Sequence, residues 1–121
     1  YGCLLSQPNP KWFYLEVDQN GDIVMNITNT NTNDIDFAIW GPVTDISTGC
    51  TNDILANAPI DCSYSTAANE TATITGANVG ETYIMVITNF DNTPTTISFS
   101  QSSGSGSTDC GITLPVNLIN F

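Results

Sequence analysis

The feature that most constrains the fold is a period-two alternation of apolar and polar residues, which recurs in short segments along much of the chain. Such alternation places apolar side chains on one face of an extended strand and polar side chains on the other. No segment keeps a helical period over ten residues. The strand pattern occupies residues 12–17, 23–27, 34–42, 71–75, 82–88 and 95–101. Short strands separated by turn residues predict an all-β fold, a single antiparallel β-sandwich.

The segment 34–42, Asp-Ile-Asp-Phe-Ala-Ile-Trp-Gly-Pro, is unusual because two carboxylates open a predicted central strand. Asp34 and Asp36 project from the same face, about 7 Å apart along the strand. Their repulsion therefore needs compensation. Proline lacks the amide proton of a further ladder bond, so Gly41-Pro42 is expected to end the strand.

The other segments indicate how the strands connect. Segment 82–88 is apolar on both faces, as expected of a central strand. Asn20-Gly21 stands between two alternating segments and predicts a hairpin turn. Segment 43–68 is expected to be a long irregular region, and the Ser/Gly composition of 102–108 is typical of a flexible linker.

The charge of the chain restricts its partners. Twelve acidic residues face a single basic one, Lys11, and histidine is absent, which gives a formal charge of −11. Nucleic acids and anionic lipids would be repelled by such a surface, so we expect neither nucleic-acid binding nor membrane insertion. Cations, neutral glycans and protein surfaces are the favoured partners.

Four cysteines, Cys3, Cys50, Cys62 and Cys110, form an even set without any Cys-x-x-Cys spacing. Because histidine is also absent, two disulfides in an extracellular, oxidising compartment are favoured over a structural zinc site. The pairing does not follow from sequence alone. The expected arrangement is Cys50–Cys62, closing a loop, and Cys3–Cys110, joining the two ends.

Several motifs together resemble a module common in secreted multidomain proteins of Bacteroidetes. They are Asn-Pro-Lys-Trp-Phe-Tyr-Leu at 9–15, Asn-Gly-Asp at 20–22, the 34–42 block, Asp-Cys-Ser-Tyr-Ser at 61–65, Gly-Glu-Thr-Tyr-Ile at 80–84, Ile-Thr-Asn-Phe at 87–90 and Thr-Asp-Cys at 108–110. The plan is more distantly similar to bacterial pre-peptidase C-terminal domains, which are jelly-roll-like sandwiches with an Asp-x-Asp strand. The resemblance implies a jelly-roll-like fold and an accessory, non-catalytic role.

Residues 114–118, Leu-Pro-Val-Asn-Leu, resemble the entry to the sorting tail of the type IX secretion system. This resemblance implies export to the cell surface or the medium. We therefore expect a β-sandwich domain over residues 1–110. Residues 111–121 would then form a C-terminal edge strand and the start of a linker to a missing sorting domain.

The closely spaced carboxylates suggest calcium as a cofactor. Calcium takes several oxygen ligands, and Asp34 and Asp36 would supply two of them. Asn89 and Asp91 would add more if strand 82–88 lies beside strand 34–42. The alternative is that Asp34 caps a turn and Asp36 accepts hydrogen bonds from the backbone or an indole.

Aromatic residues suggest a second kind of site, a carbohydrate platform. Trp12, Tyr14 and Tyr64 have flat rings and polar neighbours that suit the CH groups of a sugar. The alternative is packing within or between the sheets, which is the commoner fate of such residues. Trp40 is expected to be buried.

Catalysis is not expected. Without histidine there is no Ser-His-Asp or Cys-His arrangement, and Asp34 and Asp36 lie on one strand instead of flanking a cleft. The sequence predicts an extracellular binding or adhesion module of a larger protein, with calcium as candidate cofactor. The alternatives are a carbohydrate-binding module that targets a polysaccharide-degrading enzyme, and a fibre subunit that forms homo-oligomers by adding the apolar strand 112–121 to a neighbouring copy.

Overall fold

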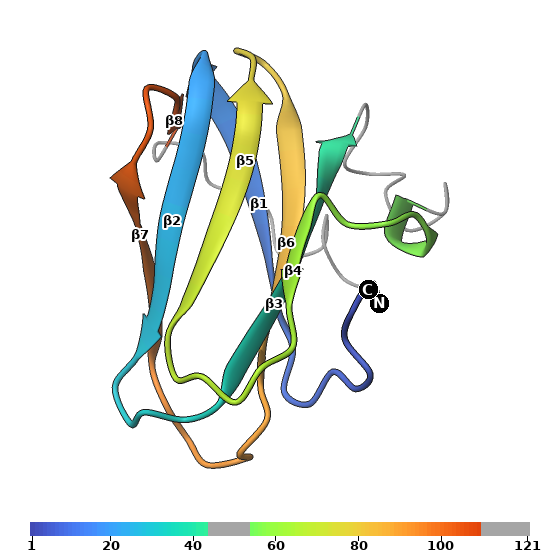
Figure 1. Ribbon diagram of the computed structural model, residues 1–121, viewed down its shortest axis with the longest axis vertical. Helices are drawn as coiled ribbons and strands as arrows, with labels where there is room; N and C mark the ends of the chain where they lie inside the picture. Colours follow the sequence, from blue (N-terminus) through green and yellow to red (C-terminus); the bar gives the residue numbers. More distant parts are fainter. Residues whose placement is uncertain (44–53, 110–121) are drawn as a thin grey trace.

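The computed structural model describes residues 1–43 and 54–109, which fold into two antiparallel β-sheets. The elements are β1 (Lys11–Gln19), β2 (Gly21–Asn29), β3 (Ile35–Val43), the 3-10 helix η2 (Ile54–Ala56), β4 (Asp61–Ser63), β5 (Glu70–Ala77), β6 (Thr82–Asn89), β7 (Ile97–Ser103) and β8 (Ser107–Thr108). One sheet has the order β4-β3-β6-β1-β8 and the other β5-β2-β7, and the two form the layers seen in Figure 1. The predicted all-β fold with antiparallel sheets is confirmed.

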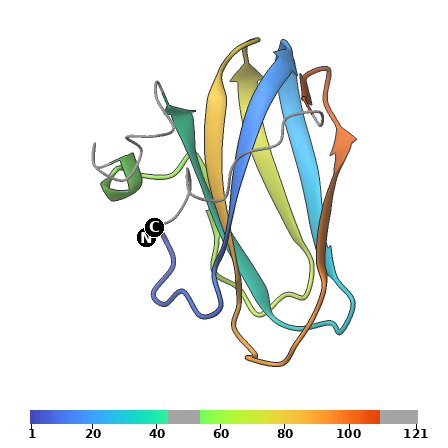
Figure 2. The same cartoon turned by 180° about the vertical axis from the view of Figure 1, so that it is seen from behind.

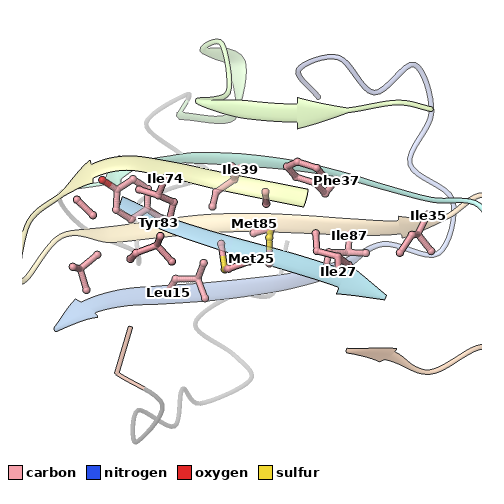
Figure 3. Close-up of a cluster of buried hydrophobic side chains, with 14 residues drawn as sticks. Leu15, Met25, Ile27, Ile35, Phe37, Ile39, Ile74, Tyr83, Met85 and Ile87 are labelled. Atoms are coloured by element: carbon pink, nitrogen blue, oxygen red, sulfur yellow. The ribbon is translucent and has the colours of Figure 1, made fainter. Parts of the chain in front are cut away.

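The main core lies between the two sheets. Met25, Ile27 and Ile74 from the three-stranded sheet meet Phe37 and Met85 from the five-stranded sheet, as Figure 3 shows. In β3 the alternate residues Ile35, Phe37 and Ile39 contribute to this core, as the alternation predicts. Each such side chain that leaves water contributes about 1.5–3 kcal/mol, so this layer dominates the stability of the fold.

A second apolar cluster covers the outer face of the five-stranded sheet. Trp40 and Val86 pack there with Leu4 from the N-terminal segment and Leu55 from η2. The indole Nε1 of Trp40 donates to the carbonyl oxygen of Asn57 at 3.1 Å. Strands β3 and β6 are therefore buried on both faces, and the prediction that segment 82–88 is a central strand is confirmed.

The predicted disulfide pairing is wrong. Cys3 is bonded to Cys62, with their Cα atoms 6.1 Å apart, so neither Cys50–Cys62 nor Cys3–Cys110 forms. The reason is the path of the N-terminal segment, which crosses the outer face of the sheet beside β4 and brings Cys3 to Cys62 (Figure 2). Cys50 and Cys110 lie outside the described residues.

The predicted hairpin at Asn20-Gly21 is also wrong, because β1 and β2 belong to different sheets. The Asn-Gly pair instead carries the chain from one sheet to the other. Gly21 has φ +133°, and the Oδ1 atom of Asn20 accepts a hydrogen bond from the backbone N–H of Val79 at 2.7 Å. A short turn between two alternating segments can thus join strands of different sheets as well as neighbouring strands of one sheet.

Two further expectations fail for reasons of backbone packing. Strand β3 does not end at Pro42: its register with β6 shifts between Trp40 and Val43, and such an irregularity is where a sheet tolerates proline. Residues 102–108 are not a linker, because β7 extends to Ser103 and β8 pairs with β1.

Segment 43–68 is more regular than expected where it is described. It contains η2 and β4, and β4 pairs with β3. The predicted C-terminal edge strand, residues 111–121, lies outside the described residues.

Candidate functional site

Strands β3 and β6 are antiparallel neighbours, as the calcium hypothesis required. Asp36 is directly opposite Thr88, and Ile35 is opposite Asn89. Paired residues share a face of the sheet. Because Ile35 points into the core between the sheets, Asn89 points to that side, whereas Asp36 and Thr88 point to the outer face.

The side chain of Asn89 is therefore not with the two aspartates. Its Nδ2 donates to the carbonyl oxygen of Thr93 at 2.7 Å, and its Oδ1 accepts from Nδ2 of Asn33 at 3.2 Å. Asp91 does lie near Asp34, since its Oδ2 accepts the backbone N–H of Asp34 at 2.8 Å. Of the four predicted metal ligands, the structure places Asp91 beside Asp34, whereas the side chain of Asn89 points to the other face of the sheet.

Asp36 is almost completely buried, with 2% of its surface exposed. Its Oδ1 accepts the backbone N–H of Ser65 at 2.9 Å, which is one of the alternatives considered for this residue. Burial raises the pKa of Asp36 to about 6, and the nearby charges of Asp34 and Glu70 act in the same direction. The hydrogen bond from Ser65 opposes this rise without cancelling it.

The backbone N–H and C=O of Asp34 both form hydrogen bonds, but its carboxylate is not fully hydrogen-bonded. Its carbonyl oxygen accepts the backbone N–H of Phe90 at 2.9 Å, in addition to the bond from its own N–H to Asp91. Its Oδ1 is buried without a hydrogen-bond partner. Burial raises the pKa of Asp34, and the charges of Asp91 and Glu70 add to the effect.

These carboxylates line a pocket of about 150 Å3 on the outer face of the sheet. Tyr64, which follows β4, and Phe90, which follows β6, form its aromatic side. Their ring centroids are 6.2 Å apart in an edge-to-face arrangement at 84°, and the side chains are 36% and 45% exposed. We call this pocket, lined by Asp34, Asp36, Tyr64, Ser65, Thr66 and Phe90, the acidic pocket.

A second unpartnered oxygen belongs to Thr88, which does not line the acidic pocket. Thr88 is fully buried and shares the outer face with Asp36, yet its Oγ1 has no hydrogen-bond partner. Buried polar groups in proteins are nearly always hydrogen-bonded, and an exception calls for a water, an ion or a ligand. Asp34 and Thr88 thus present acceptors whose donors the described residues do not supply.

The chain has little positive charge with which to balance these acids. Lys11 is the only basic side chain in the sequence. It lines a separate pocket of about 230 Å3 together with Asn9, Asn92 and Ile97. No group of three or more His, Cys, Asp and Glu residues that could hold a metal ion occurs among residues 1–43 and 54–109.

The predicted carbohydrate platform is not assembled as one surface. Trp12 packs edge-to-face on Tyr1 at 5.6 Å and stacks on Trp40 at 6.3 Å, and Trp40 is buried as expected. The hydroxyl of Tyr14 donates to Oε2 of Glu16 at 3.3 Å. Trp12 and Tyr14 both belong to β1. Tyr64 directly follows β4, which is separated from β1 in the sheet by β6 and β3. Only Tyr64 of the predicted set reaches the acidic pocket.

Phe90 and Thr88 are the functional candidates that the sequence analysis missed. Both follow from the register once β3 and β6 are paired, because alternate residues of β6 share the face of Asp36. The sequence signal is the run Thr88-Asn89-Phe90, which continues the alternation past the apolar part of the strand.

No protein-family model matches this chain, and no curated protein sequence is significantly similar to it. Within the described ranges, no helix is long and apolar enough to cross a membrane. The acidic pocket therefore carries the functional argument.

Proposed function

We propose that this domain is a non-catalytic binding or adhesion module of a secreted or cell-surface protein, and that it holds its ligand in the acidic pocket. The observation that carries the proposal is the combination found there. Two acids with raised pKa, an oxygen without a partner and two partly exposed aromatic rings converge on one cavity. Convergent polar groups beside aromatic walls are typical of ligand sites.

The disulfide supports the extracellular part of the proposal. Cys3–Cys62 would be reduced in most cytosolic environments but persists in oxidising ones. The strand pairs β1–β8, β2–β7 and β3–β6 support the jelly-roll assignment, because a long hairpin rolled into two layers makes these pairs. Strand β4 departs from that scheme by pairing with β3.

The placement of the carboxylates supports a non-catalytic role. Asp34, just before β3, and Asp36, within β3, are two residues apart in sequence and both line the acidic pocket. Glycoside hydrolysis by two carboxylates needs them on opposite sides of the scissile bond. The domain thus binds through these acids without using them as an acid–base pair.

The test is a binding screen with matched variants. The fluorescently labelled domain is applied to glycan and peptide arrays, alongside Tyr64→Ala/Phe90→Ala and the control Val79→Ala. Val79 is a similarly exposed apolar residue, 61% exposed, in the turn between β5 and β6. We expect ligands that bind the wild type and the control but not the double variant. Ligands bound equally by all three proteins would contradict the proposal.

Carbohydrate recognition is the second candidate, and the exposed rings of Tyr64 and Phe90 beside acceptor carboxylates favour it. The glycan array decides: binding that Tyr64→Ala abolishes and Trp12→Ala leaves intact supports a sugar site at the acidic pocket. If Trp12→Ala and Tyr14→Ala abolish binding instead, the site lies on β1 as first predicted. The fibre hypothesis concerns residues 112–121, outside the described part, and remains a prediction.

A further inference from the structure

The acidic pocket has an excess of negative charge that the chain itself does not neutralise. The charge of Asp34 raises the pKa of Asp36, the charge of Asp91 raises the pKa of Asp34, and the charge of Glu70 raises both. The only lysine of the sequence lines another pocket, among Asn9, Asn92 and Thr95. A ligand that brings positive charge would remove this repulsion.

The carboxylates that line the pocket specify what the ligand must offer. They are acceptors, and Oδ1 of Asp34 has no hydrogen-bond partner among the described residues. An ammonium group supplies three donors and a guanidinium five, and neither has an acceptor. Calcium would need six to eight oxygens, and the three-acid group that would provide them is absent from the described residues.

The aromatic side favours an organic cation over a bare ion. The rings of Tyr64 and Phe90 stand edge-to-face at the pocket, and aromatic faces attract ammonium and guanidinium groups while packing on their aliphatic stems. The volume of about 150 Å3 is about ten times the roughly 10–15 Å3 that one buried water needs on the same measure. The cavity has room for the end of a side chain.

We propose that the acidic pocket binds the cationic end of a lysine or arginine side chain presented by a partner protein. This inference rests on the proposed function and names its ligand class. The charge rests against the carboxylates of Asp34 and Asp36, and the stem lies along Tyr64 and Phe90. The net charge of −11 would draw a basic partner surface toward the domain.

The experiment is an NMR titration of the domain with the acetyl-methylamide derivatives of lysine and arginine at pH 7.5. We expect saturable shifts at the rings of Tyr64 and Phe90 and at the amide of Ser65. The derivatives of Nε-acetyl-lysine and norleucine, which lack the charge, should bind at least ten-fold more weakly. Asp36→Asn should weaken lysine binding at least ten-fold, whereas Asp18→Asn, the same charge change at an exposed site near the other end of the sandwich, should leave it unchanged.

Four outcomes would overturn the inference. They are equal binding of charged and neutral probes, an equal loss of affinity in Asp36→Asn and Asp18→Asn, saturable shifts with calcium chloride but not with the organic cations, and tighter binding of the free polyamine spermidine than of either amino-acid probe. None of these decides the proposed function, which fails only if array ligands ignore Tyr64→Ala/Phe90→Ala.

Discussion

At the scale of single residues, Asp36 is the most informative side chain. It lies in β3 between two neighbouring strands, and among the described residues only the N–H of Ser65 donates a hydrogen bond to its carboxylate. The sequence predicts that Asp36 lies in a strand, as the second carboxylate of segment 34–42. It does not predict that Asp36 is buried, because the burial depends on the segment after β4, whose composition is typical of an irregular region.

Asp36→Asn is expected to stabilise the domain at neutral pH. The folded protein binds a proton at Asp36 more tightly than the unfolded chain does, since the pKa rises from 3.8 to about 6. The stability that protonated Asp36 contributes is fully present below 3.8 and is lost as the pH rises through about 6. An asparagine keeps an oxygen for Ser65 without the charge. At pH 7.5 we expect a gain of about 1 kcal/mol, or a few degrees in Tm.

The measurement is thermal unfolding of both proteins between pH 5 and 8. The difference between them should shrink toward zero as the pH approaches 5, where Asp36 of the wild type is largely protonated. Both proteins contain the same other acids, so the contributions of those acids to the pH dependence of stability cancel in the comparison. Glu81 is one of them, and hydrogen bonds from Asn78 and Tyr83 lower its pKa. A constant difference across this range would show that Asp36 is already neutral or already compensated at pH 7.5.

At the scale of elements, strands were predictable and their connections were not. Alternation depends on the local sequence and identifies β1, β2, β3, β5, β6 and β7 to within a few residues. Asn20-Gly21 fits a hairpin and a crossing between sheets equally well, and only the packing of β1 and β2 decides. The acidic pocket was half predictable for the same reason: Asp34, Asp36 and Tyr64 were identified as candidate site residues, but Phe90 joins them through the register of β3 with β6.

The segment 102–108 illustrates how composition misleads and permits a direct test. The chain passes so close to β2 that a Cβ at Gly104 would collide with the carbonyl oxygen of Asp22, and Gly104 has φ +105°. Gly104→Ala should therefore destabilise the domain by about 2–4 kcal/mol, from strain and displaced backbone. Gly76→Ala is the control, because Gly76 also has a positive φ (+63°) but open space around it. It should cost only about 1 kcal/mol.

Chemical denaturation of the two glycine variants provides the comparison. If Gly104→Ala unfolds at the same denaturant concentration as Gly76→Ala, residues 102–108 behave as the linker that their composition indicates. The packing of Gly104 on Asp22 would then be irrelevant to stability.

The disulfide is the element that joins the N-terminal segment to β4. It links residues 59 apart in sequence, and the entropy of closing such a loop corresponds to about 4 kcal/mol, with distortion reducing the effect. Replacing both Cys3 and Cys62 by serine should lower stability by about 2–4 kcal/mol. Peptide mapping without reduction should recover Cys3 linked to Cys62. A peptide linking Cys62 to Cys50 would contradict the structure.

At the scale of the whole molecule, the charge of −11 on a chain of 121 residues opposes folding. Compact folding brings like charges together, and Lys11 is the only side chain that can offset them. Salt shortens the screening length from about 30 Å at 0.01 M to about 8 Å at 0.15 M. We therefore expect Tm to rise by several degrees when sodium chloride is increased over this range, with most of the rise complete at 0.15 M.

The same scan separates general screening from a specific metal site. Calcium chloride and sodium chloride are compared at equal ionic strength, with Asp36→Asn beside the wild type. A pocket that awaits an organic cation should show nearly equal midpoints in the two salts. A bound ion instead adds stability that grows with the logarithm of its concentration above Kd. An extra rise with calcium that Asp36→Asn abolishes would therefore return the acidic pocket to the calcium hypothesis, with Asp34, Asp36 and Asp91 as its ligands and Asn89 excluded by the face on which it lies.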